Sequence, residues 1–76
     1  MEESLQAIIE ALVSDPTEVL VEERKEEGTI IFEVKAAESD MGKVIGKEGR
    51  IAKAIRTVMR AVANKEDKRV NIEFIG

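Results

Sequence analysis

The chain has 76 residues and a formal net charge of −4, with 43% hydrophobic and 37% charged residues and neither cysteine nor histidine. This composition excludes disulfides, a thiolate zinc site, the commonest metal ligand and the usual general base. We therefore expect a single small domain over residues 1–76, with no metal or other cofactor and no enzymatic activity. No apolar run approaches the roughly 20 residues of a membrane span, and the acidic N-terminus is unlike a signal peptide, so we expect a cytoplasmic protein with no membrane partner.

The charge is distributed unevenly along the chain. Residues 1–40 carry 12 acidic and 3 basic side chains, a balance of −9. Residues 41–60 carry 6 basic side chains against a single acidic one, a balance of +5, and residues 61–76 balance at zero. The local sign of the charge decides where a polyanion can bind, so residues 41–60 are the candidate nucleic-acid segment despite the net acidity. The alternative interpretation is a solvated face of two helices.

The first half of the chain predicts a helix followed by a hairpin. Residues 1–13 place their apolar side chains on one helical stripe, and Ser14-Asp15-Pro16 ends the helix. Glutamates rather than lysines on its polar face argue against a membrane-surface helix. Residues 17–26 and 29–36 alternate in polarity, which predicts two antiparallel strands that turn at Gly28. The alternation separates Leu20 and Ile31 from the inward-facing set, which is Val19, Val21, Ile30, Phe32 and Val34.

The second half predicts two helices and a final strand. The side chain of Ser39 or Asp40 is expected to cap a short helix over residues 41–45 that ends at Gly46. Gly42 within this helix is either a groove wall that a ligand can approach or part of a loose first turn. A longer helix over residues 50–64 carries an apolar stripe at helical spacing, made of Ile51, Ala54, Ile55, Val58, Met59 and Val62.

The last segment, residues 69–75, alternates as a third strand, with Val70, Ile72 and Phe74 on the inward face. It follows a helical crossover, so it can lie parallel to the second strand. The order α-β-β-α-α-β therefore predicts an α+β fold of two layers, in which a three-stranded mixed sheet is covered on one face by three helices.

A four-residue loop with glycine at each end separates the two predicted helices. Gly46 and Gly49 permit positive φ and close approach of another backbone. The amides of residues 47–51 are expected near a helix N-terminus, where unpaired N–H groups and the helix dipole favour an anion. Lys47 and Arg50 add full positive charges at the same place. These features predict a docking point for a phosphate backbone.

The run from Val44 to Ile55, VIGKEGRIAKAI, resembles the core of a KH domain, whose GxxG loop clamps the backbone of about four nucleotides. The resemblance extends over nearly the whole chain and is greatest to the small bacterial single-KH proteins of the KhpA family. It implies a type II KH fold and binding of single-stranded RNA, with single-stranded DNA as a variant. Carried over by position, the phosphate contacts are Gly46, Lys47, Glu48 and Gly49. The groove candidates near the bases are Met41, Lys43, Val44, Ile45, Ile51 and Lys53.

Several features of the sequence argue against tight binding at this site. Val44 and Ile51 are equally well explained as core residues. Glu48 offsets the charge of Lys47, and both aromatic residues, Phe32 and Phe74, fall on inward strand positions, which removes base–aromatic stacking. We therefore expect weak, salt-sensitive binding with little sequence preference. The variable loop of the KH groove is expected at residues 64–68.

Useful affinity then requires a second module. By resemblance, this is a homodimer or a heterodimer with a larger Jag-type KH protein, acting in RNA chaperoning or post-transcriptional regulation. The alternative is an interaction module that dimerises through the KH helices and binds little RNA itself. Leu20, Ile31 and Ile75 are further candidates for a contact surface on the open sheet face. The glycine loop also lacks the Gly-Lys-Ser/Thr ending of a nucleotide-binding P-loop.

Overall fold

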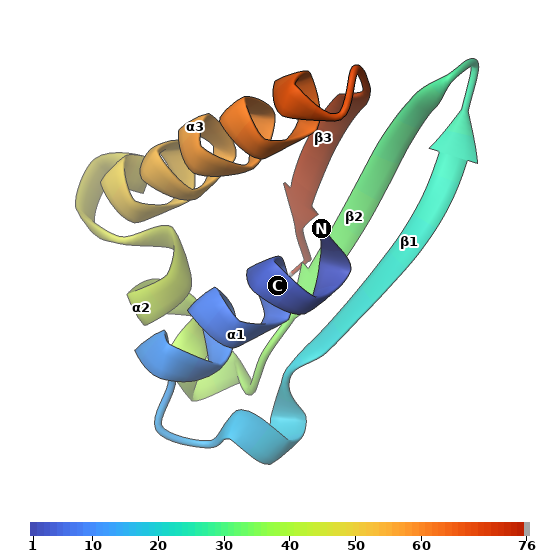
Figure 1. Cartoon of the computed structure of the whole chain (residues 1–76). Coiled ribbons are helices and arrows are strands. Elements are labelled where there is room, and N and C mark those ends of the chain that lie inside the picture. Colours follow the sequence, from blue (N-terminus) through green and yellow to red (C-terminus); the bar gives the residue numbers. More distant parts are fainter. Residues whose placement is uncertain (76) are drawn as a thin grey trace.

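The computed structural model describes residues 1–75 and has the expected element order (Figure 1). The helices and strands are α1 (Glu2–Leu12), β1 (Leu20–Glu26), β2 (Thr29–Lys35), α2 (Met41–Ile45), α3 (Arg50–Lys65) and β3 (Arg69–Phe74). Single 3-10 turns occupy Pro16–Glu18, Glu38–Asp40 and Lys47–Gly49. All three helices lie on one side of a three-stranded sheet, which confirms the predicted α+β fold of two layers.

The sheet has the order β1-β2-β3 and is mixed, as predicted. β1 pairs antiparallel with β2, and β2 pairs parallel with β3, so the helical crossover returns the chain beside the second strand. The hairpin turns at Glu27 and Gly28, whose φ values of 49° and 81° are both positive, as a two-residue type I′ turn requires. A right-twisted pair of strands favours this turn because its own twist matches theirs.

The core lies between the helices and the inner face of the sheet. Leu5 and Ile9 of α1, Phe32 and Val34 of β2 and Met59 of α3 are all fully buried. α1 packs on β1, and α3 packs on β3. The inward set predicted for the strands is confirmed for Val19, Val21, Ile30, Phe32, Val34, Val70 and Ile72, which are buried. Phe74, the last of the set, is only half-buried and packs against the core.

Most element boundaries agree with the prediction to within one residue, and two of the differences have a clear physical cause. β1 begins at Leu20 rather than Thr17, because the Asp15 side chain accepts a hydrogen bond from Thr17 N at 3.2 Å and holds residues 16–18 in a 3-10 turn. α3 runs one residue further than expected and ends in a Schellman motif, with Asp67 at φ 58°. In this motif Lys68 N donates to Ala63 O at 2.9 Å, so the loop predicted at residues 64–68 shortens to residues 66–68.

The buried face of α3 also differs from the predicted stripe. Ile55 and Met59 are buried as expected, but the same face continues through Ala52 and Ala63, while Ala54 is exposed and Val58 is 50% exposed. Ala54 and Val58 lie toward α1 instead, where they line a groove together with Ile8 and Leu12.

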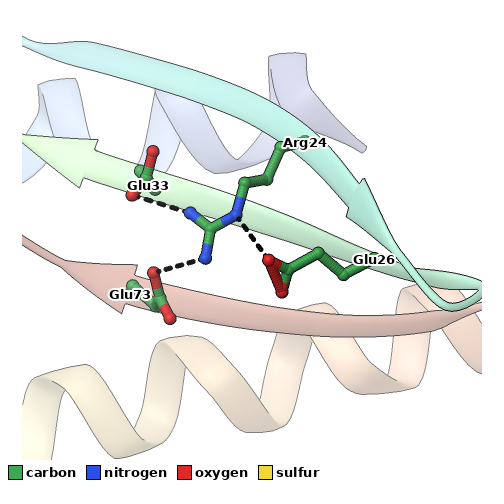
Figure 2. Close-up of polar contacts among 4 residues, drawn as sticks. All are labelled: Arg24, Glu26, Glu33 and Glu73. Atoms are coloured by element: carbon green, nitrogen blue, oxygen red, sulfur yellow. Dashed lines mark hydrogen bonds and ion pairs between the residues drawn. The ribbon is translucent and has the colours of Figure 1, made fainter.

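The open face of the sheet carries a charged network (Figure 2). Arg24 of β1 pairs with Glu33 at 2.7 Å, Glu73 at 3.3 Å and Glu26 at 3.5 Å, so one guanidinium ties all three strands together. Desolvation lowers the pKa of Arg24, but the hydrogen bond to Glu33 and the charges of the three glutamates outweigh it and raise the pKa above its ordinary value.

The network also bears on the expected exposure of the open face. Leu20 and Ile75 are 47% and 37% exposed, in line with the prediction, whereas Ile31 is only 6% exposed. Arg24 and Asn71 flank Ile31 in the register of the two neighbouring strands, and long side chains of the network lie on the same face. Ile31 is therefore not an available contact residue.

Candidate nucleic-acid interface

The loop between α2 and α3 has the backbone that its glycines were expected to allow. Gly46 has φ 78° and ψ 170°, a conformation that is essentially restricted to glycine, and Gly49 has φ 73° and ψ 16°. A Cβ atom on Gly46 would lie 2.6 Å from Ile51 Cγ1 and 2.9 Å from Ile51 N, whereas nothing lies within 4 Å of the corresponding position on Gly49. The first glycine therefore permits close packing of the loop on α3, and the second supplies only the left-handed turn.

The loop amides are less available than the sequence suggested. Gly49 N donates to Gly46 O at 3.1 Å, and Arg50 N donates to Lys47 O, so two of the amides predicted to face an anion bond within the loop. Glu48 is held at φ 58°, a left-handed conformation that costs a non-glycine residue about 1–2 kcal/mol. Lys47 and Glu48 at this turn are exposed, just before the N-terminus of α3.

The charges around the loop divide into paired and unpaired groups. Arg50 Nη2 lies 3.5 Å from Glu48 Oε2, but both side chains are mostly exposed, and such a pair contributes only about 0–1 kcal/mol. Glu48 therefore pairs with Arg50 and not with Lys47, the partner expected from the sequence. Among residues 1–75, no carboxylate lies within ion-pair distance of Lys47 or Lys53, and both side chains are exposed.

Lys43 occupies a different setting from the other candidate cations. Its Nζ lies 3.3 Å from Asp40 Oδ1 and donates to Ser14 Oγ. Asp40 is 2% exposed and accepts hydrogen bonds from Ser14 N at 3.2 Å and Asp15 N at 3.1 Å. These backbone bonds, followed by Lys43, hold the pKa of Asp40 below its ordinary value. The contacts of Asp40 and Lys43 with Ser14 and Asp15 thus join α2 to the segment after α1, and we call these contacts the clasp.

The same contacts correct the expected cap of α2. Neither Ser39 nor Asp40 makes a side-chain hydrogen bond to the first turn of this helix. The Asp40 carboxylate reaches the backbone of the α1–β1 connection instead, across 25 residues of sequence. No local pattern signals such a partner.

The apolar candidates differ in how much surface they present. Met41 is 7% exposed and Val44 is fully buried, which places Val44 in the core. Ile51 is half-buried and packs against that core, and Ile45 is 36% exposed. Of the four, only Ile45 and Ile51 offer a ligand appreciable surface beside the loop.

α3 presents two distinct flanks on either side of its buried face. With 3.6 residues per turn, Lys53, Arg56 and Arg60 lie together on the flank toward β3. Arg56 Nε donates to Ile72 O at 3.3 Å, and its guanidinium lies over the Phe74 ring. We call Lys47 of the loop, together with Lys53, Arg56 and Arg60 of α3, the basic flank. The site predicted from the sequence did not include Arg56 and Arg60, although their i, i+4 spacing is evident in the sequence.

Arg56 and Arg60 are spaced i, i+4, so their like charges repel mildly unless carboxylates lie nearby. Among residues 1–75, no carboxylate forms an ion pair with Arg56 or Arg60. Of the carboxylates in residues 1–40, Glu26 and Glu33 pair with Arg24, and Asp40 pairs with Lys43. A basic surface without counter-ions thus runs from the loop along α3.

The opposite flank of α3 borders an apolar groove. Its lining comes from both long helices and consists of Ile8, Leu12, Arg50, Ile51, Ala54, Ile55 and Val58. Val58 is the most exposed of the large apolar residues here, at 50%. Arg50 is the one charged residue of this lining, whereas Glu2 and Glu3 at the start of α1 line a separate hollow beside Glu23 and Lys25.

Two further features of the described chain bear on its class. None of the helices formed by residues 1–75 has the length and apolar character needed to cross a membrane. Within the same residues, no three metal-ligating side chains gather as a metal site. The element order, the mixed sheet and the GxxG loop between two helices define the chain as a KH domain of the type II arrangement.

Comparison with known families agrees with this class and specifies it. A model described as the KH domain of KhpA and KhpB matches residues 2–74, and the chain belongs to this family. It is 57% identical over 75 residues to the RNA-binding protein KhpA of Clostridium acetobutylicum, a match that covers 99% of this chain and 100% of the relative. It is 41% identical to the protein of the same name from Listeria monocytogenes, with 99% of each chain covered.

Solved structures share the fold at low sequence identity. A crystal structure of Era from Aquifex aeolicus bound to GDP and AlF4⁻ superimposes with a TM-score of 0.69 at 20% identity, over 96% of this chain. A second structure, of Era with MgGDPNP and nucleotides of 16S ribosomal RNA, gives a TM-score of 0.60 at 18% identity. This chain spans 28% of each of those chains, so the likeness concerns the fold of one part of Era.

Proposed function

We propose that the chain is an RNA-binding protein that holds single-stranded RNA between the GxxG loop and the basic flank of α3. The observation that carries this proposal is the uncompensated charge of Lys47, Lys53 and Arg60, which are exposed and free of carboxylate partners within residues 1–75. The curated relatives are named RNA-binding proteins and align along their whole length, which supports the same ligand.

The binding mode follows from the loop. A phosphate lies against the turn of residues 46–49, near Lys47 and the N-terminal end of α3, where the helix dipole favours an anion. The chain continues along the basic flank beside β3. Lys43 contributes less than the sequence suggested, because its ammonium already contacts Asp40 and Ser14. The site has few charged side chains and no other side chain that reads the bases. We therefore expect weak, salt-dependent binding.

Charge reversal at two matched lysines tests this mode. Lys47→Asp alters the loop, and Lys35→Asp makes the same change on an exposed lysine at the open end of β2. We expect Lys47→Asp to weaken binding of labelled single-stranded RNA about tenfold or more and to lower the salt slope, while Lys35→Asp changes little. Fluorescence anisotropy at about 50 and 200 mM salt measures both quantities. A DNA oligomer of the same sequence separates dependence on the 2′-hydroxyl.

Equal losses from the two substitutions would contradict the loop as the binding point, because they would reflect net charge alone. Circular dichroism of each variant checks that it is folded. A wild type that binds no RNA at low salt would contradict the function itself and favour an interaction module.

We also propose that two copies associate through the apolar groove between α1 and α3. A two-fold interface requires a self-complementary surface, and apolar side chains of one copy can cover those of the other. The groove lining is apolar except for Arg50, and Val58 within it is 50% exposed, so a second copy would bury this surface. A dimer gives two RNA sites, so weak single-site binding gains from linkage.

Val58→Glu tests the groove, and Leu20→Glu is its matched control on the open sheet face, since the two side chains are 50% and 47% exposed. Sedimentation equilibrium is expected to show a monomer for Val58→Glu only. Dissociation by Leu20→Glu alone would move the interface to the sheet. A monomeric wild type that captures a Jag-type KH protein through Val58 would favour the heterodimer.

A further inference from the structure

An arginine and a phenylalanine form a stacked pair at the edge of the sheet, where the proposed function assigns only charge. Within residues 1–75, β3 is the last strand of the order β1-β2-β3, so its outer edge has no neighbouring strand. Arg56 reaches this strand from α3. Its Nε donates to Ile72 O at 3.3 Å, and its Cζ lies 5.1 Å from the centre of the Phe74 ring.

These two contacts hold the guanidinium in a defined position. The hydrogen bond to Ile72 O anchors the Nε side, and the Cζ atom lies over the Phe74 ring. A cation over an aromatic face is attracted by the ring quadrupole. Both side chains are half-buried, so part of the pair remains accessible to solvent.

Arg56 differs in its counter-charges from Arg24, the arginine on β1. Arg24 is surrounded by three glutamates, whereas no carboxylate among residues 1–75 pairs with Arg56. An arginine that is oriented but electrostatically uncompensated, on the same flank as Lys53 and Arg60, is suited to an anionic ligand that also has a flat face. Nucleotides of a single strand have both properties.

The aromatic inventory makes this position unusual within the chain. The sequence has 2 phenylalanines and neither tyrosine nor tryptophan, and Phe32 is fully buried. Phe74, which the sequence pattern assigned to the core, is half-buried and carries Arg56 on its face. Bases stack on arginine planes as well as on aromatic rings, so the pair supplies a stacking surface that the sequence alone appeared to lack.

We propose that the Arg56–Phe74 pair is a base-stacking position, in which one unpaired base of a single-stranded RNA lies on the outer face of the Arg56 guanidinium. The inference rests on the proposed RNA-binding function and adds a contact to the base rather than the backbone. A guanidinium plane carries no hydrogen-bond code, so the position favours a large π-face, a purine over a pyrimidine, without reading a particular sequence.

Arg56→Lys tests the position, because it keeps the charge and removes the plane. Arg69→Lys is the matched control, since Arg69 is exposed at the start of β3 and borders the same hollow as Arg60, but within residues 1–75 its guanidinium lies over no aromatic ring. The probes are an oligoadenylate, an oligouridylate and an abasic oligonucleotide of equal length, which share the same phosphates. Wild type is expected to bind in the order oligoadenylate, oligouridylate, abasic.

Arg56→Lys is expected to weaken oligoadenylate binding about five- to tenfold, to leave abasic binding and the salt slope unchanged, and so to flatten the order. Phe74→Leu, which keeps an apolar side chain and removes the ring support, is expected to act in the same direction by a smaller factor. Arg69→Lys is expected to keep the wild-type order. Circular dichroism melting verifies that each variant is folded.

Equal affinities of wild type and Arg56→Lys for oligoadenylate would overturn the stacking position. If Lys47→Asp still abolishes binding of the abasic oligonucleotide in that case, the proposed RNA-binding function stands without the stacking position. If wild type binds none of the three probes, the stacking position and the proposed function are both overturned. An equal loss on all three probes would show that the Arg56 guanidinium contacts the phosphates and not a base, which also overturns stacking.

Discussion

The two charged surfaces of this protein contain similar residues but differ in whether their cations are paired. On the open sheet face, Arg24 is enclosed by Glu26, Glu33 and Glu73, and its charge serves to join three strands (Figure 2). On the flank of α3, Lys53, Arg56 and Arg60 have no carboxylate partner within residues 1–75. The difference teaches that the availability of a cation depends on where the carboxylates lie, and not on the net charge of −4.

The backbone follows the same division. The hairpin turn at Glu27 and Gly28 and the loop at Glu48 and Gly49 both use a non-glycine residue at positive φ followed by a glycine. The hairpin turn connects two strands, whereas the loop packs on Ile51 and projects beside a helix N-terminus. Matched substitutions in the two turns therefore separate the energetic cost of the positive-φ conformation from the effect of the turn's location.

The largest expected effect is at Gly46. A Cβ there meets Ile51 at 2.6–2.9 Å and φ is +78°, so Gly46→Ala combines overpacking with backbone strain and is expected to lower the free energy of unfolding by about 3 kcal/mol. Gly49→Ala and Gly28→Ala have open space and positive φ only, so each is expected to cost about 1–2 kcal/mol. Urea unfolding measures all three. Equal losses would show that the close packing of the loop on Ile51 contributes nothing.

The clasp between α2 and the segment after α1 gives the next effect, and it depends on pH. Since the pKa of Asp40 is lowered in the folded state, its ionised form stabilises the fold above its unfolded pKa, and this contribution is lost as the pH falls through the folded pKa. Asp40→Asn is therefore expected to lose stability at neutral pH, with a difference from wild type that shrinks below about pH 4.

Urea unfolding across this pH range measures the Asp40 effect, with Glu38→Gln as an exposed control on the preceding turn. A difference that stays constant on acidification would mean that shape and not charge at Asp40 holds the clasp.

Removing the central cation of the sheet network tests the other surface. Arg24→Met leaves three glutamates facing one another, so we expect a lower free energy of unfolding that recovers as salt screens their repulsion. RNA affinity should stay close to wild type, because the network lies on the face away from the proposed site. A large loss of RNA binding by the folded variant would break the distinction between the two surfaces.

The smallest effect compares two strained glutamates. Asparagine tolerates the left-handed conformation, so Glu48→Asn and Glu27→Asn are each expected to stabilise the fold by up to about 1 kcal/mol. Only Glu48→Asn removes a negative charge from the proposed phosphate site, and it is expected to raise RNA affinity about two- to fivefold. An equal gain in affinity from Glu27→Asn would indicate that net charge, and not position, controls binding.

The sequence by itself determined the element order, the inward strand positions and the GxxG loop. These features are local: alternation with period two, helical spacing and glycine before a helix each act within a few residues. The same locality explains the misplaced start of β1, where the Asp15 side chain competes with strand pairing at residues 17–18.

Only the tertiary structure decided which charged residues are engaged. Asp40 binds backbone 25 residues away, Arg24 reaches Glu73 from another strand, and Arg56 meets Phe74 across the α3–β3 contact. Which apolar residues of α3 are buried was likewise decided by its packing, which buries Ala52 and Ala63 but leaves Val58 50% exposed. Each of these contacts joins residues distant in the chain, and their energies depend on distance and burial, which no local pattern carries.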